Sequence, residues 1–214
     1  MTLHALRHVS SAVHHAEALA DEADDLCVVE LSARLRARAA SVEADLEAAV
    51  RAVDGVAPLR EARARSHGML LAVYGEVTHE IERLFAPEEA SKLSPGGNLD
   101  VAERLRFRLR HLPQTGADAL LDVRVLLERA LFDYDNAVDA YLIGCADAQS
   151  KKDRAIVKSQ ALRMELERAK HTLLVRAEPK TAAWVRIKRR TVRTKRARWL
   201  DEAKAQRLLA VALA

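Results

Sequence analysis

The sequence has little of what a compact, ligand-binding domain usually contains. Aromatic residues make up only 4% of the 214 residues, so the apolar half of the chain consists mostly of alanine and aliphatic side chains. Such side chains favour closely packed helices over a deep, aromatic-lined ligand pocket. No apolar run approaches the ~20 residues that a membrane-spanning helix needs, and the first residues hold no hydrophobic signal core. We therefore expect a cytoplasmic protein without a membrane span.

Cysteine is scarce as well. Cys27 and Cys145 are far apart in the sequence, and neither belongs to a CxxC pair. The prediction is two reduced, mostly buried thiols. Nucleophilic catalysis is not expected, because neither cysteine has an evident histidine base. The sequence also lacks a glycine-rich phosphate loop, so no cofactor is predicted.

Glycine and proline are few, and they are grouped. All five prolines and four of the seven glycines fall within residues 55–58, 87–97, 113–116 and at Pro179. Such clusters indicate breaks between helices. The stretches between them predict helices at roughly 2–53, 59–85, 98–111, 117–177 and 180–212.

Apolar residues recur along these stretches at spacings of three and four, which is typical of a helix that buries one face. A helix of about 60 residues is about 90 Å long, too long for a compact ball of this size. We predict an all-α fold, an elongated bundle of long antiparallel helices with coiled-coil-like packing. Residues 1–179 would form the bundle, and residues 180–214 a basic helix packed on it or extending from it. The predicted core residues are Leu35, Val42, Leu46, Val73, Val77, Ile81, Leu127, Leu131, Val138 and Leu166.

The stretch 98–111 carries conflicting signals. Residues 104–110 alternate strictly between arginine and apolar residues, which indicates a strand. Against this, Asn98 suits an N-cap, and Asp100 and Glu103 suit a first helical turn. We predict a helix, with a strand as the alternative.

The charges are distributed unevenly. Residues 180–198, called the basic segment below, hold nine Lys or Arg and no acid, which leaves −5 for the rest of a chain whose net charge is +4. Residues 16–33, the acidic stretch, hold six acids and no Lys or Arg. On a helix, Val185, Val192 and Trp199 would recur every seven residues as a packing seam. Like charges at i,i+4 repel by about 0.3 kcal/mol per pair, so the segment is expected to face an anion. The predicted anion-binding residues are Arg186, Lys188, Arg189, Arg190, Arg193, Lys195, Arg196 and Arg198.

Two partners fit the basic segment better than bulk solvent does. Guanidinium groups match phosphates, which points to DNA or RNA; the other partner is an acidic protein surface, such as the acidic stretch of the same or a neighbouring copy. The predicted function is that of a non-enzymatic interaction protein that assembles through aliphatic helix faces and docks this partner with its basic C-terminal helix. A direct nucleic-acid binder would also place Arg34, Arg36 or residues 104–110 near the basic segment.

One motif suggests metal chemistry instead. Glu76 and His79 form a Glu-x-x-His, which ferritin-like di-iron bundles use in pairs. No other histidine has a glutamate three residues earlier. Glu128, Asp135 and Asp139 would have to supply the remaining carboxylates. The alternative function is therefore a metal-binding helical-bundle enzyme centred on Glu76 and His79, and it requires carboxylates that converge on His79.

Overall fold

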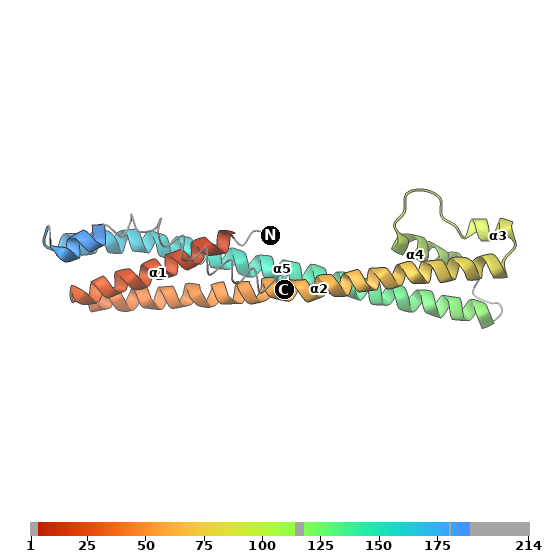
Figure 1. Cartoon of the computed structure of the whole chain (residues 1–214), viewed down its shortest axis with the longest axis horizontal. Coiled ribbons are helices and arrows are strands. Elements are labelled where there is room, and N and C mark those ends of the chain that lie inside the picture. Colours follow the sequence, from red (N-terminus) through yellow and green to blue (C-terminus); the bar gives the residue numbers. More distant parts are fainter. Residues whose placement is uncertain (1–3, 114–117, 180, 189–214) are drawn as a thin grey trace. The chain divides into compact units, whose positions relative to one another are not determined.

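Helices dominate the computed structural model, which describes residues 4–113, 118–179 and 181–188 (Figure 1). Of these described residues 89% are helical, and none lies in a strand. The helices are α1 His4–Asp25, α2 Val29–Leu84, α3 Pro87–Lys92, α4 Val101–His111 and α5 Asp118–Arg176. Residues 182–188 are helical as well. The predicted all-α fold is confirmed.

The prediction of one continuous helix over residues 2–53 is wrong, because the chain turns between the end of α1 at Asp25 and the start of α2 at Val29. Cys27 adopts a φ of 56°, in the left-handed region that glycine normally occupies. The Val28 N–H donates to the Ala23 carbonyl at 2.7 Å, and the Cys27 N–H donates to that of Asp24 at 2.9 Å. This pair of bonds is a Schellman cap built without glycine. The prediction of mostly buried thiols also fails here: Cys27 is exposed in this turn, whereas Cys145 is partly buried.

The predicted break at residues 55–58 does not occur. Helix α2 continues through Gly55 and Pro58, although a proline inside a helix removes one hydrogen bond and crowds the preceding turn. Packing on both sides of the proline accounts for this result. Val56 is buried, and Leu59 lies so close to Gly144 of α5 that a Cβ there would be 2.4 Å from Leu59 Cδ1.

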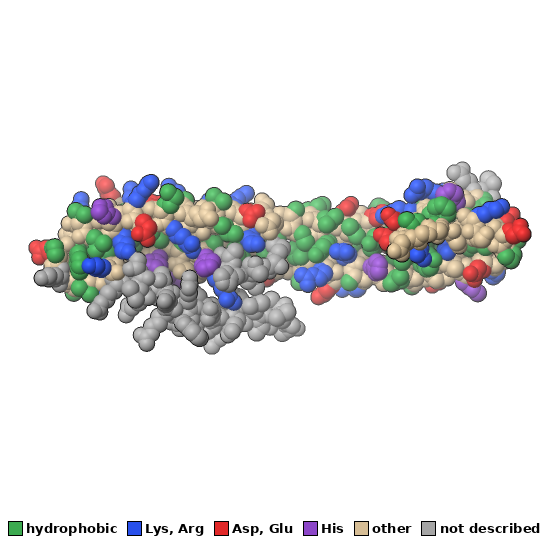
Figure 2. Space-filling view, turned by 90° about the horizontal axis from the view of Figure 1, so that it is seen from above, with side chains coloured by type: hydrophobic (Ala, Val, Ile, Leu, Met, Phe, Trp, Pro, Cys, Tyr) green, Lys and Arg blue, Asp and Glu red, His purple; other side chains and the backbone are tan. Residues whose placement is uncertain are grey.

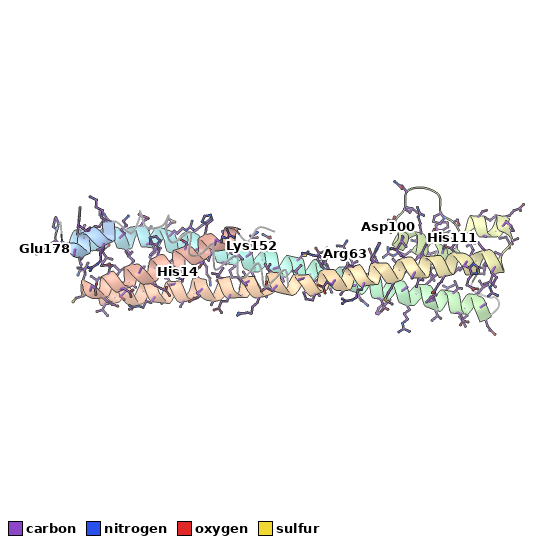
Figure 3. The ribbon with its side chains drawn as sticks, in the orientation of Figure 1. His14, Arg63, Asp100, His111, Lys152 and Glu178 are labelled. Carbon is purple, nitrogen blue, oxygen red and sulfur yellow. The ribbon has the colours of Figure 1, made fainter. Side chains whose placement is uncertain are left out.

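The predicted helix at residues 98–111 is confirmed, with a different cap. The Asp100 side chain accepts a hydrogen bond from the Glu103 N–H at 2.8 Å, and the Glu103 side chain accepts one from the Asp100 N–H at 3.4 Å. This capping box starts α4 two residues after Asn98. Asp100 and His111 mark the two ends of α4 in Figure 3. The short helix α3, with Pro87 at its start, was predicted as part of a break.

The chain divides into two compact units. The first, unit 1, comprises residues up to 54 and from 146 onward. Within it α2 and α5 run antiparallel, since Arg34 pairs with Glu165 at 2.8 Å while Asp45, later in α2, pairs with Lys158, earlier in α5, at 2.6 Å. Helix α1 packs against both through small and aliphatic side chains. The core includes Val9, Val13, Ala16, Leu19, Leu35, Ala39, Val42, Leu162, Leu166 and Leu173.

Unit 2 comprises residues 55–145 and has its own core. Here too α2 and α5 are antiparallel. Arg63, labelled in Figure 3, lies over the Tyr141 ring at 5.1 Å, and His67 lies 6.0 Å from the Tyr134 ring. Helices α3 and α4 complete the packing. The core includes Leu70, Val73, Val77, Ile81, Leu93, Leu105, Val123, Leu127 and Leu131.

Eight of the ten predicted core residues are buried, and the other two, Leu46 and Val138, are partly buried. Within the described ranges, no helix combines the length and the apolar character needed to cross a membrane. The proposed division into residues 1–179 and 180–214 stays a prediction, because most of the second part lies outside the described residues.

Candidate functional site

Two of the eight predicted anion-binding residues, Arg186 and Lys188, fall within the described part of the chain. The seam residues Val192 and Trp199 lie outside the described residues. So do the other six predicted anion-binding residues, Arg189, Arg190, Arg193, Lys195, Arg196 and Arg198.

The beginning of the basic segment packs on unit 1. After Glu178 (Figure 3), Thr181 caps a new helix: its Oγ1 accepts a hydrogen bond from the Trp184 N–H at 3.3 Å. Ile187 has an exposed fraction of 0% and belongs to the unit 1 core, and Trp184 packs against the same core. The buried anchor is therefore Ile187, whereas the predicted seam residue Val185 is only partly buried.

Arg186 binds two carboxylates at the end of α1. Its Nε lies 3.1 Å and 3.3 Å from the two Glu22 oxygens, and its Nη2 lies 3.4 Å from Asp25 Oδ2. The hydrogen bond that Arg186 donates to Glu22 raises the pKa of Arg186 above its ordinary value. The side chain of Glu22 is 3% exposed, and a buried carboxylate needs a paired cation. For Arg186, then, the acidic counterpart lies in the same chain.

The rest of the acidic stretch is largely occupied in the same way. Arg36 pairs with Asp21 at 3.0 Å and with Asp24 at 2.6 Å. Hydrogen bonds from Ser32 and then Arg36 lower the pKa of Asp24. Glu17 contacts His14 at 3.5 Å.

Five of the six acids of the acidic stretch thus have a partner within unit 1. Glu30 is the one for which the described residues provide no ion pair. These contacts occupy five acids but do not neutralise the acidic stretch: its six acids meet two arginines, Arg36 and Arg186, which leaves a charge of −6 + 2 = −4 with His14 neutral.

A second positive site lies on unit 1, and the sequence analysis missed it. Arg34 and Arg38 of α2 line an open groove with Arg168 of α5. One carboxylate, Glu165, accepts from both α2 arginines, at 2.8 Å from Arg34 and 3.4 Å from Arg38. Three guanidinium groups therefore face one acid. The i,i+4 spacing of Arg34 and Arg38 was the local signal, but the contribution of Arg168 depends on the pairing of the two helices.

Of the other arginines that a direct nucleic-acid binder was expected to expose, three are engaged, whereas Arg110 is exposed. Arg36 is held by Asp21 and Asp24, and Arg106 of α4 pairs with Asp135. Arg108 is 2% exposed and donates to Thr78 Oγ1 at 2.5 Å.

Arg108 is part of the unit 2 interior. Its guanidinium lies 4.5 Å from the centre of the Tyr74 ring, a cation–π geometry. Burial lowers the pKa of Arg108. Its contact with Thr78 gives one residue of the Glu-x-x-His a structural role.

The Glu-x-x-His itself faces outward. Glu76 and His79 are exposed, whereas Val77 between them is fully buried. Both line an open groove of unit 2 with Asp122. In the described part of the chain, no group of three or more His, Cys, Asp or Glu side chains is arranged to hold a metal ion. Of the additional carboxylates that a metal site would need, Glu128 pairs with Arg124.

No protein-family model matches the chain, and no curated protein or solved structure matches it either.

Proposed function

We propose that this chain is a non-enzymatic helical interaction protein that assembles through apolar helix faces and binds nucleic acid through the phosphates, using its basic segment. The composition of the basic segment supports the choice of nucleic acid over an acidic protein surface, because it is rich in arginine and guanidinium groups match phosphates. Residues 189–198 bring six further cations and no acid. The carboxylates of Asp21, Glu22, Asp24 and Asp25 already contact Arg36 or Arg186 in unit 1, which favours an anion from outside the chain for these further cations.

Arg186 has a different role in this proposal. It is committed to the buried Glu22, and together with Ile187 it ties the start of the basic segment to unit 1. We assign Arg186 as a positioning residue and residues 189–198 as the phosphate-binding residues. The groove of Arg34, Arg38 and Arg168 on the same unit offers an additional site for a phosphate.

The test is a gel shift of the full chain with unrelated DNA duplexes and single strands over a range of salt concentrations. The log–log slope of affinity against salt should be about −0.9 for each duplex phosphate neutralised. Little sequence preference is expected, because phosphate contacts carry no base information.

The decisive variant replaces Arg189, Arg190, Arg193 and Arg196 by Gln, which should reduce the slope by up to about four units. The matched control replaces four other arginines by Gln, all exposed: Arg51, Arg60, Arg65 and Arg83. It removes the same charge and should leave most of the binding intact. Equal losses in both variants would indicate general charge attraction. No binding at micromolar protein would exclude nucleic acid and leave an acidic protein surface as the partner.

A further inference from the structure

The groove between α2 and α5 of unit 1 holds more positive charge than its own acid offsets. Its charged lining consists of Arg34, Arg38 and Arg168 against Glu165, three guanidinium groups and one carboxylate, for a net charge of +2. By contrast, Arg36 of the same helix contacts two acids. Lys and Arg side chains are scattered over the surface of unit 1 (Figure 2), but in this groove three guanidinium groups share one carboxylate.

Glu165 lies deeper in the groove than the two arginines that contact it. The Glu165 side chain is 18% exposed, whereas those of Arg34 and Arg38 are 61% and 62% exposed. Their Nε atoms contact separate oxygens of Glu165, at 2.8 Å and 3.4 Å. A carboxylate offers about four acceptor sites, while three guanidinium groups carry about fifteen N–H donors. Most of these donors therefore remain for an anion with several oxygens.

The helices that carry the groove are held in place by the core beneath it. Leu35, between the two α2 arginines in the sequence, is fully buried, and Leu166, next to Glu165, is buried as well. The backbones of the charged residues are thus fixed before a ligand arrives, which lowers the entropic cost of binding.

The charge and the lining of the groove favour a phosphate monoester. Such a group carries about −1.5 to −2 at pH 7, which matches the net charge of the lining, whereas each phosphodiester of a nucleic-acid backbone carries one negative charge. Ala161 and Met164 add an apolar part to the lining, against which the organic part of a ligand can pack. The volume of about 350 Å³ falls in the ~300–1,000 Å³ range of ligand pockets.

We propose that this groove binds a phosphate monoester, supplied by the phosphorylated end of a nucleic-acid strand or by a free nucleotide. The inference deepens the proposed function and rests on it, since there the groove is an additional site for a phosphate. The basic segment contacts phosphodiesters along the backbone, and the groove takes a doubly charged terminal group.

Isothermal titration calorimetry of the full chain tests the groove with adenosine monophosphate and with adenosine. The mononucleotide should bind with one site per chain, and adenosine, which lacks the phosphate, should not bind. Arg168→Gln should weaken binding of the mononucleotide about tenfold, through the loss of a charge-assisted hydrogen bond. Among the described residues none forms an ion pair with Arg168, so its replacement should leave the helicity unchanged, which circular dichroism checks.

The matched control is Arg154→Gln, at an exposed position on the same helix and in the same unit. Arg154 lies about 21 Å from Arg168 along α5 at ~1.5 Å per residue, so its loss should leave the affinity unchanged. Equal losses in the two variants would indicate general charge attraction and overturn the site. Binding of adenosine as tight as that of the mononucleotide, or no binding of the mononucleotide at millimolar concentration, would overturn it too.

The basic-segment variant with four arginines replaced by Gln separates this inference from the proposed function. It should lose most of its duplex binding and still bind the mononucleotide. Loss of mononucleotide binding in that variant would place the site on the basic segment and overturn the inference. If the wild-type chain fails to shift duplexes but binds the mononucleotide, the proposed function fails and the groove stands.

A short single strand then distinguishes the two sources of the phosphate, again in the basic-segment variant. If strand ends are the ligand, a strand phosphorylated at its 5′ end should bind about tenfold more tightly than the same strand with a hydroxyl there. Equal affinities of the two strands, alongside binding of the mononucleotide, would assign the groove to free nucleotides.

Discussion

Replacing Leu127 by alanine should destabilise unit 2 by about 2–5 kcal/mol. The Leu127 side chain has an exposed fraction of 0% and lies in the core with Leu70, Val77 and Leu105. Loss of three carbon atoms costs about 2.4 kcal/mol in transfer free energy, at ~0.8 kcal/mol per CH₂. The upper part of the range applies if the surrounding helices do not close the cavity. Long helices that pack along their whole length have little room to collapse at one position, so a value above the transfer term is expected.

Leu142→Ala is the matched control. It makes the same chemical change in the same helix and the same unit, at a side chain that is 57% exposed. The expected change is within about 0.5 kcal/mol of wild type. The assay is urea unfolding followed by far-ultraviolet circular dichroism, with the free energy of unfolding taken from midpoint and slope. If Leu127→Ala stayed within that margin, or if Leu142→Ala cost as much, the assignment of the unit 2 core would be refuted.

Three further predictions concern the backbone and one carboxylate. Gly75→Ala should stabilise α2 by about 0.5–1 kcal/mol, because a Cβ at Gly75 meets nothing within 4 Å. Gly144→Ala should bring no gain in stability, because its Cβ would lie 2.4 Å from Leu59. Thermal unfolding compares the two variants, and equal gains would contradict the close approach of Leu59 to Gly144. Pro58→Ala should restore a helical hydrogen bond and stabilise α2 by up to ~3 kcal/mol, and a loss of stability in the same assay would show that the proline suits its site. Asp24→Asn should destabilise the protein near neutral pH: the folded-state pKa of Asp24 is lowered from its ordinary 3.8, so its contribution is present above that value and is lost as pH falls through the folded pKa. Urea unfolding at neutral and at acid pH measures the difference, which should shrink as the pH falls below 3.8; a constant difference would contradict the ion pair.

Local sequence determined the fold class and much of the core. The three–four spacing of apolar residues predicted helices and eight buried positions, among them Leu35, Val77 and Leu127. It also favoured the helix over the strand at α4, because Asn98 suited an N-cap and Asp100 and Glu103 a first turn; the structure confirms the helix and places the cap at Asp100. These features depend on residues within a turn or two of each other, so they can be predicted from the sequence alone.

Only the tertiary structure decided where the long helices break. The turn at Cys27 uses a left-handed residue that is not glycine, so no local signal marks it. Helix α2 continues through Pro58 because α5 offers Gly144 for close packing of Leu59. The cost of a proline is local, whereas the packing that offsets it comes from a segment far along the chain.

The candidate site divides in the same way. The sequence showed an acidic stretch and a basic segment. It was consistent with pairing of the two within the chain and equally with a partner outside the chain. The pairing of Glu22 with Arg186, 164 residues apart, and the meeting of Arg34 and Arg38 with Arg168 follow from the antiparallel packing of unit 1. A charge pattern indicates that a segment pairs with opposite charges, and only the folded structure shows which charges are already paired within the chain.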